Sequence, residues 1–280
     1  MKKAQRVLIF LLLLIFVYNF CSCRKSIDEI EQRFAQYKAD NNVVAVLDDS
    51  VFYFYDHTLH LKDIANDEEP NKGYLFLQNK LFFSTSKKNA MFDYTFCVYE
   101  CDIYGNNKKM IFEKSGYKTH PWATANNGLF YLEYYESNAM DKSSRKIDSY
   151  DVIKGAYENV SIGEDVSLSD YKKASNGKYT FNYEKDVLTI TDTQTESKYK
   201  IDNNTLCESD FGESLIGLDC AFFDHKATND GRIYLVYRIK FNGPPYPYII
   251  CEYIPDIGEV VFKSFFSASD VQYIKVENVR

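Results

Sequence analysis

Five times along the chain, a pair of turn-forming residues is followed at once by a dense run of aromatic and β-branched residues. The five runs are VFYFY (51–55), LFF (81–83), LFYLEYY (129–135), KYTFNY (178–183) and RIYLVYRI (232–239). Asn-Gly or Asp-Gly precedes the last three, and these dipeptides are the strongest short-range signal for a β-hairpin. A second hairpin pattern follows four of the runs, at residues 95–112, 146–162, 187–201 and 248–266. Each repeat therefore predicts three or four antiparallel strands.

These runs are mostly continuous rather than alternating with polar residues, which predicts strands that are buried on both faces. Small sheets stacked radially in a β-propeller meet this requirement, because each sheet covers its neighbours. Residues 42–280 divide into five repeats of about 48 residues, close to the length of known blades. The 24 Tyr and 21 Phe fit the same architecture, since large rings fill the gaps between blades. We predict an all-β protein with a propeller of about five three- to four-stranded blades; a large β-sandwich is the alternative.

The first repeat is incomplete, because only the short segment TLHLKDI (58–64) follows its aromatic run. The C-terminal segment VQYIKVENV (271–279) has the composition of a strand. We predict that it pairs into the first repeat, which would close the ring and remove an exposed sheet edge.

The N-terminus has the organisation of a secretory signal. Lys2, Lys3 and Arg6 precede an unbroken apolar run, VLIFLLLLIFV (7–17). Eleven apolar residues are too few for a comfortable transmembrane helix and are typical of a signal peptide. Beyond it, Ser26 and Glu29 form a capping-box pattern, and apolar residues follow at helical spacing. This pattern predicts a short helix over residues 27–38.

The end of the signal resembles a bacterial lipoprotein signal, with Phe20-Cys21-Ser22 as the lipobox and Cys23 as the lipidated residue. The resemblance implies a signal peptide over residues 1–22, a palmitate-bearing lipid anchor at Cys23 and a linker over residues 23–41. Residues 42–280 resemble, in pattern, the Tyr-rich TolB-like propellers of exported bacterial lipoproteins, which implies architecture and little about activity. An uncleaved anchor and plain secretion are the alternatives to lipidation at Cys23.

Charge argues against a nucleic-acid partner. The net charge of −7 becomes −10 once Lys2, Lys3 and Arg6 leave with the signal peptide. Binding to nucleic acid needs a basic surface, which this composition does not provide.

The cysteines beyond the leader do not form a metal-binding or redox motif. Their spacing is irregular, no C-x-x-C occurs, and they are expected to be small buried apolar residues. They are Cys97, Cys101, Cys207, Cys220 and Cys251. We expect no cofactor and no metal: His57 and His60 would face opposite sides of one strand, and DIYGNN (102–107) is expected to be a hairpin turn rather than a calcium loop.

Candidate catalytic groups are few. Asp224 and His225 are adjacent and His120 lies at a junction between repeats, so these three are the first candidates for acid–base chemistry. No nucleophile motif accompanies them.

Two aromatic residues are candidate ligand-binding groups. Trp122, the single Trp, follows His120-Pro121 and could stack on a ligand ring or sugar; packing between blades is the alternative. Tyr246 lies in the Pro-rich stretch GPPYPY (243–248), where it could serve a contact surface or a stiff connector.

The leading hypothesis is a lipid-anchored, extracytoplasmic protein of the bacterial cell envelope whose propeller binds a ligand, glycan or protein partner without catalysis. A hydrolase or lyase acting on glycan or peptide is the first alternative, and a structural subunit of an envelope complex is the second.

Overall fold

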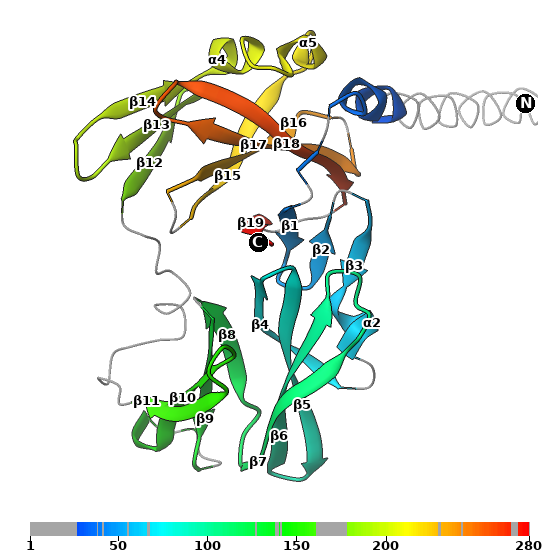
Figure 1. Cartoon of the computed structure of the whole chain (residues 1–280), viewed down its shortest axis with the longest axis vertical. Helices are drawn as coiled ribbons and strands as arrows, with labels where there is room; N and C mark the ends of the chain where they lie inside the picture. The colour runs from blue at the N-terminus through cyan, green and yellow to red at the C-terminus, as the bar shows by residue number, and fades with distance from the viewer. Residues whose placement is uncertain are drawn as a thin grey trace, which may run out of the picture. The chain divides into compact units, whose positions relative to one another are not determined.

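The computed structural model describes most of the chain after residue 26 (Figure 1). The described residues are 27–37, 39–40, 42–54, 56–65, 68–126, 128–137, 140, 142–160, 178–228, 231–241, 243–269 and 274–279. The predicted signal peptide and Cys23 lie outside these residues. Among the helices of the described residues, none combines the length and apolar character required to cross a bilayer.

Strands of the described residues form five antiparallel sheets, so the predicted all-β class is confirmed. Four sheets have four strands and one has three, as the repeats predicted. The chain divides into two compact units: unit 2 comprises 41–179, 226–231 and 272–280, and unit 1 comprises the rest.

Unit 2 contains three sheets, here called A, B and C. Sheet A has the order β19 (Ile274–Asn278), β1 (Val43–Leu47), β2 (Val51–Tyr53), β3 (Thr58–His60). Sheet B comprises β4 (Glu69–Leu77), β5 (Lys80–Ala90), β6 (Asp93–Asp102) and β7 (Lys109–Tyr117). Sheet C comprises β8 (Trp122–Asn126), β9 (Leu129–Tyr135), β10 (Arg145–Asp151) and β11 (Ala156–Val160). Two short helical segments, α2 (Leu61–Ala65) and η1 (Lys142–Ser144), lie between strands.

Unit 1 contains sheets D and E. Sheet D comprises β12 (Tyr179–Glu184), β13 (Val187–Asp192) and β14 (Lys198–Ile201). Sheet E comprises β15 (Cys220–Ala227), β16 (Ile233–Ile239), β17 (Tyr246–Ile254) and β18 (Glu259–Ala268). The helices α4 (Asn203–Cys207) and α5 (Gly212–Leu215) connect the two sheets along the chain.

The predicted pairing of the C-terminal segment with the first repeat is confirmed. Strand β19 pairs antiparallel with β1, with Val43 opposite Asn278 and Leu47 opposite Ile274. The first and last strands of the chain thus share sheet A, and β19 supplies the strand that the first repeat lacks.

Hairpin turns follow the expected chemistry. Gln78 and Asn79 both have positive φ between β4 and β5, as do Lys185 and Asp186 between β12 and β13. Two residues at positive φ make a type I′ turn, whose twist matches that of the flanking strands.

The prediction for the fourth repeat is wrong by one strand. In the other four repeats the aromatic run is the second strand of its sheet in chain order, whereas KYTFNY contains β12, the first strand of sheet D. Asn176-Gly177, predicted as its hairpin turn, lies outside the described residues. The turn that corresponds to the others is Lys185-Asp186, which lies between β12 and β13 and carries neither Asn-Gly nor Asp-Gly.

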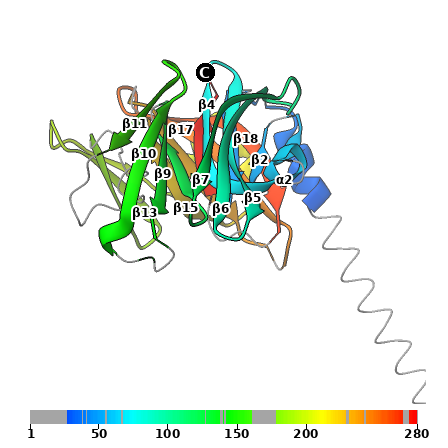
Figure 2. The same ribbon diagram turned by 90° about the horizontal axis from the view of Figure 1, so that it is seen from below.

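Sheets B and C pack face to face (Figure 2). Their shared core contains residues from both sheets: Leu75, Phe82, Phe96 and Val98 from sheet B, and Ala123, Phe130, Leu132 and Tyr150 from sheet C. A second core joins sheets A and B through residues such as Val44, Phe52, Leu81 and Phe83. Inter-sheet packing by large side chains is what the aromatic runs predicted.

The cysteine prediction is confirmed at four positions and wrong at one. Cys97, Cys101, Cys220 and Cys251 are buried free thiols, whereas Cys207 at the end of α4 is exposed. Burial raises the pKa of the Cys97 thiol to about 11 and of the Cys101 and Cys220 thiols to about 12. These three thiols stay protonated at neutral pH, as expected of groups that serve packing.

Candidate surface on sheet C

Trp122 begins β8, and 54% of its surface is exposed. The alternative in which the ring packs between sheets is therefore wrong. Its partner in the β8–β9 ladder is Glu133. Side chains directly opposite each other in a ladder point to the same face of the sheet, about 5 Å apart, so Glu133 lies beside the indole.

The register places further aromatic and charged residues on this face. Tyr131, Glu133 and Tyr135 alternate along β9, and Arg145 of β10 lies opposite Tyr135. All four are half-buried, while the intervening Phe130 and Leu132 are fully buried against sheet B. We call this surface the Trp122 face, which consists of Trp122, Tyr131, Glu133, Tyr135 and Arg145.

Glu133 and Arg145 form a rigid polar pair within the Trp122 face. Arg145 Nε donates to Glu133 Oε1 at 2.8 Å, and its Nη2 donates to Oε2 at 3.2 Å. Both side chains are 17% exposed. A bidentate contact of this kind holds donors and acceptors in one plane, next to an exposed indole.

The His120 ring packs beside the Trp122 indole. Its ring centroid lies 5.2 Å from that of Trp122 and 5.7 Å from that of Tyr94. Its Nε2 lies 3.4 Å from Glu69 Oε2, while its Nδ1 is buried without a hydrogen-bond partner. Burial lowers the pKa of His120, and the Glu69 carboxylate opposes this effect. A neutral ring with the proton on Nε2 fits these contacts, because Glu69 accepts and the Nδ1 site offers no acceptor.

The Asp224–His225 pair lies on β15 in unit 1 and thus in a different unit from His120. The His225 Nδ1 atom is 4.0 Å from Asp224 Oδ1, a distance too long for the hydrogen bond that orients a catalytic histidine. The imidazole instead stacks on Phe181, with centroids 3.7 Å apart. Burial lowers the pKa of His225, with Asp224 acting in the opposite direction. His225 thus packs against an aromatic ring, while Asp224 Oδ1 accepts the backbone N–H of His225 at 2.7 Å.

Tyr246 is the first residue of β17, also in unit 1. The ring is half-buried, and the Arg238 guanidinium lies 5.3 Å from its centroid. Tyr246 therefore belongs to a different unit from the Trp122 face.

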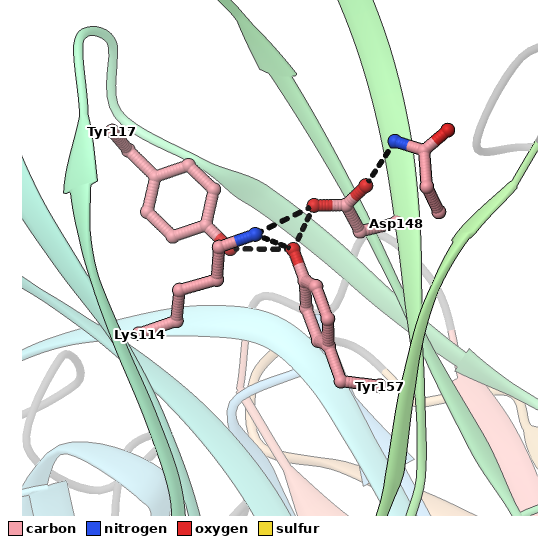
Figure 3. Close-up of polar contacts among 5 residues, drawn as sticks. Lys114, Tyr117, Asp148 and Tyr157 are labelled. Atoms are coloured by element: carbon pink, nitrogen blue, oxygen red, sulfur yellow. Dashed lines mark hydrogen bonds and ion pairs between the residues drawn. The ribbon is translucent and has the colours of Figure 1, made fainter.

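Sequence reasoning missed a polar network between sheets B and C (Figure 3). The Asp148 carboxylate is 1% exposed and accepts hydrogen bonds from Tyr157, from Lys114 Nζ at 3.3 Å and from Asn159 Nδ2 at 2.7 Å. Lys114 also donates to Tyr157, and Tyr117 OH lies 3.2 Å from Tyr157 OH. Burial and the nearby Asp148 charge raise the pKa of Tyr117.

This network lies on the side of sheet C opposite the Trp122 face, because Asp148 is paired with Leu132 in the ladder. Its polar atoms satisfy one another, so the network links β7 of sheet B to β10 and β11 of sheet C. Three strands contribute to it at unrelated spacings, and no local pattern in the sequence marks it.

Among the described residues, no group of three or more His, Cys, Asp or Glu could hold a metal ion. The DIYGNN segment is the predicted hairpin turn between β6 and β7: Asp102 Oδ1 accepts the backbone N–H groups of Tyr104 at 3.0 Å and Asn106 at 2.8 Å.

Comparisons with known proteins give no relative in sequence. No family model matches the chain, and no curated protein does. Among solved structures, an endo-arabinase from Bacteroides thetaiotaomicron VPI-5482 shares 11% sequence identity at a TM-score of 0.26, over 74% of this chain and 83% of the enzyme. A TM-score this low supports no transfer of fold or activity.

Proposed function

We propose that this protein is a non-catalytic binding protein of the bacterial cell envelope, anchored by a lipid on Cys23, and that its Trp122 face recognises a glycan. The observation that carries the proposal is the exposed indole beside a fixed Glu133–Arg145 pair. An indole stacks on the apolar face of a sugar ring, while a planar carboxylate and guanidinium hydrogen-bond its hydroxyls.

We also propose that the five sheets are the blades of one propeller, in which the start of β8, with the exposed Trp122, lies at a rim and stays open to the ligand. The support is their succession along the chain, their three or four strands each and the pairing of β19 with β1. A crystal structure of residues 27–280 tests this proposal: five blades around one axis are expected, and a sandwich of two sheets would contradict it.

The binding proposal is tested on a glycan array, followed by titration calorimetry with the best oligosaccharide. Trp122→Ala is expected to weaken binding at least tenfold, which corresponds to about 1.4 kcal/mol. Tyr246→Ala is the matched control, because it removes a half-buried aromatic ring of the other unit and is expected to leave the affinity unchanged.

Three outcomes would count against this function. If the protein binds no glycan, the proposed ligand class is wrong. If the Trp122→Ala variant binds with the same affinity as the wild type, the proposed site is wrong. Shortened oligosaccharides in the calorimeter cell would favour the hydrolase or lyase alternative.

Lipidation is tested separately, by labelling cells with a palmitate analogue. The wild-type chain is expected to carry the label and to sediment with membranes, and Cys23→Ser is expected to lose both properties. Label-free wild-type protein would contradict the anchor while leaving glycan binding open.

A further inference from the structure

His120 and Trp122 belong to one short segment whose backbone is anchored to sheet B. Pro121 between them is buried, and its carbonyl accepts from Ser86 Oγ at 3.5 Å. Asn71 Nδ2 in turn donates to Ser86 Oγ at 2.6 Å, and Asn71 and Ser86 are 4% and 2% exposed. Because the backbone between the two rings is held in place, a change at the His120 ring reaches the indole through the contact of the two side chains.

The neutral His120 ring leaves one of its nitrogens without a hydrogen bond. Its Nδ1 is buried and has no partner among the described residues, while its Nε2 lies 3.4 Å from Glu69 Oε2. Uptake of a proton turns Nδ1 into a buried donor without an acceptor, which is an unfavourable state. The ring has to turn or move toward solvent to satisfy this donor. Trp122, whose ring centroid is 5.2 Å away, then loses the ring that it packs on.

Charged and aromatic groups from three strands surround the His120 ring. Glu69 of β4 faces it, and 80% of the Glu69 side chain is exposed. Tyr94 of β6 contacts the ring edge-on, and Lys88 Nζ of β5 lies 6.0 Å from the centroid of Tyr94. Burial lowers the pKa of His120, and the solvent-screened charge of Glu69 opposes this effect only in part. The ring is therefore neutral at neutral pH and takes up its proton in acidic solution.

We infer that His120 is a positioning residue for Trp122 and that protonation of its ring releases the indole, so that the Trp122 face binds its glycan tightly at neutral pH and weakly in acid. This inference rests on the proposed glycan binding and adds its regulation. The indole supplies the stacking surface of the Trp122 face, and its orientation decides how much of that surface meets a sugar ring.

The chain contains a single Trp, so the contact between the two rings can be followed without a ligand. Fluorescence excited beyond the absorption of tyrosine comes from Trp122 alone, and acrylamide is the probe of its exposure. In the full chain, the acrylamide quenching constant is expected to rise along one titration curve between pH 8 and pH 5, with a midpoint below about 6.5. Circular dichroism at each pH checks that the fold is retained.

Three variants separate this effect from general acid sensitivity. His120→Phe keeps a ring beside the indole but cannot take up a proton, so its quenching constant is expected to stay constant. Glu69→Gln removes the carboxylate that favours the protonated ring, so the midpoint is expected to move to lower pH. Glu259→Gln is the matched control, because it neutralises an exposed carboxylate of unit 1, and it is expected to keep the wild-type midpoint.

A constant quenching constant in the wild type, or a wild-type titration curve in His120→Phe, would overturn the inference. Calorimetry with the oligosaccharide selected on the glycan array tests the regulation. The wild-type affinity is expected to be several-fold lower at pH 5 than at pH 8, and the His120→Phe affinity is expected to be the same at both; equal wild-type affinities would overturn the regulation. If the quenching titrates but no glycan binds at either pH, the proposed function is wrong while the positioning of Trp122 by His120 is supported.

Discussion

At the scale of single residues, Asp148 shows how a charge is accommodated inside this fold. The carboxylate is 1% exposed, yet Tyr157, Lys114 and Asn159 all donate to it. A buried ion pair contributes little net stability compared with apolar packing, but the loss of one partner leaves the other unpaired and poorly solvated. The asymmetry between these two cases makes the network testable.

We expect Asp148→Ala to lower the free energy of unfolding by about 1–3 kcal/mol, since Tyr157 and Asn159 lose their acceptor and the partly exposed Lys114 loses its ion-pair partner. The double variant Asp148→Leu with Lys114→Met is expected to be far less destabilised, because it removes both charges. Urea denaturation measures both. Glu136→Ala is the control, since its carboxylate is 62% exposed and its loss is expected to cost less than about 0.5 kcal/mol. Equal stability of the two Asp148 variants would contradict this account.

His120 predicts a pH dependence of stability. Burial lowers its pKa in the folded protein, against an ordinary value of about 6.5 in the unfolded chain. Between the two values the unfolded chain binds a proton that the folded chain does not, so the free energy of unfolding falls as the pH drops below about 6.5. Thermal melts from pH 8 to pH 5 measure this change.

The matched variant is His120→Phe, which keeps a ring beside Trp122 and Tyr94 and removes the titrating group. The loss of stability on acidification is expected to be smaller in this variant than in the wild type. Identical pH profiles would show that His120 titrates alike in both states.

At the scale of elements, three hairpins have the same type of turn. Gly155, Glu196 and Gly258 have φ of 65°, 60° and 71°, and each donates its N–H to the carbonyl four residues earlier at 2.8–2.9 Å. Glycine adopts this left-handed conformation freely, whereas a side chain there costs about 1 kcal/mol. Glu196 therefore carries backbone strain that its counterparts in the other repeats avoid.

We expect Glu196→Gly to raise the free energy of unfolding by about 0.5–1 kcal/mol and Gly155→Ala to lower it by a similar amount. An added Cβ at Gly155 would meet nothing within 4 Å, so the Gly155→Ala variant measures the free-energy cost of the left-handed backbone conformation alone. Chemical denaturation compares the two. A destabilised Glu196→Gly protein would show that the Glu196 side chain contributes more than its backbone strain removes.

Elements were largely predictable where a local pattern marks them. The described helical residues run from Ile27 to Phe34, within the predicted helix, and the predicted capping box lies partly outside the described residues. Tyr37, beyond the last helical residue, still packs on Phe262. The prediction for sheet D is wrong by one strand, since its turn is formed by Lys185 and Asp186 and carries neither Asn-Gly nor Asp-Gly. A sequence pattern does not predict a turn where residues other than Gly and Asn adopt the left-handed backbone conformation.

At the scale of the whole molecule, the last strand of the chain completes the sheet that the first repeat begins. Val276 and Val279 are 1% and 0% exposed, and Lys275 of β19 pairs with the buried carboxylate of Asp49. The N–H of Val279 donates to Asn42, and its carbonyl accepts from Asn79. Without β19, the buried strand β1 would become an exposed sheet edge.

We expect deletion of residues 271–280 to yield insoluble or unfolded protein, because the deletion exposes the apolar strand β1. Expression and circular dichroism measure the outcome. Val276→Asp is expected to have a milder effect in the same direction, and Glu277→Gln on the outer side of β19 is expected to fold normally. A soluble, cooperatively folded truncation would contradict this role of β19.

The sequence by itself determined the all-β class, most of the hairpin succession, the helical residues before the first strand and the strand at the C-terminus, because turn chemistry and apolar runs act over a few neighbouring residues. It also singled out Trp122, as the one indole in the chain. Only the tertiary structure decided that this indole is exposed beside Glu133, that Asp224 and His225 are too far apart for a triad, and that Asp148 gathers donors from neighbouring strands. These outcomes depend on which strands pair and which sheet faces meet, and that information is carried by contacts between residues far apart in the chain.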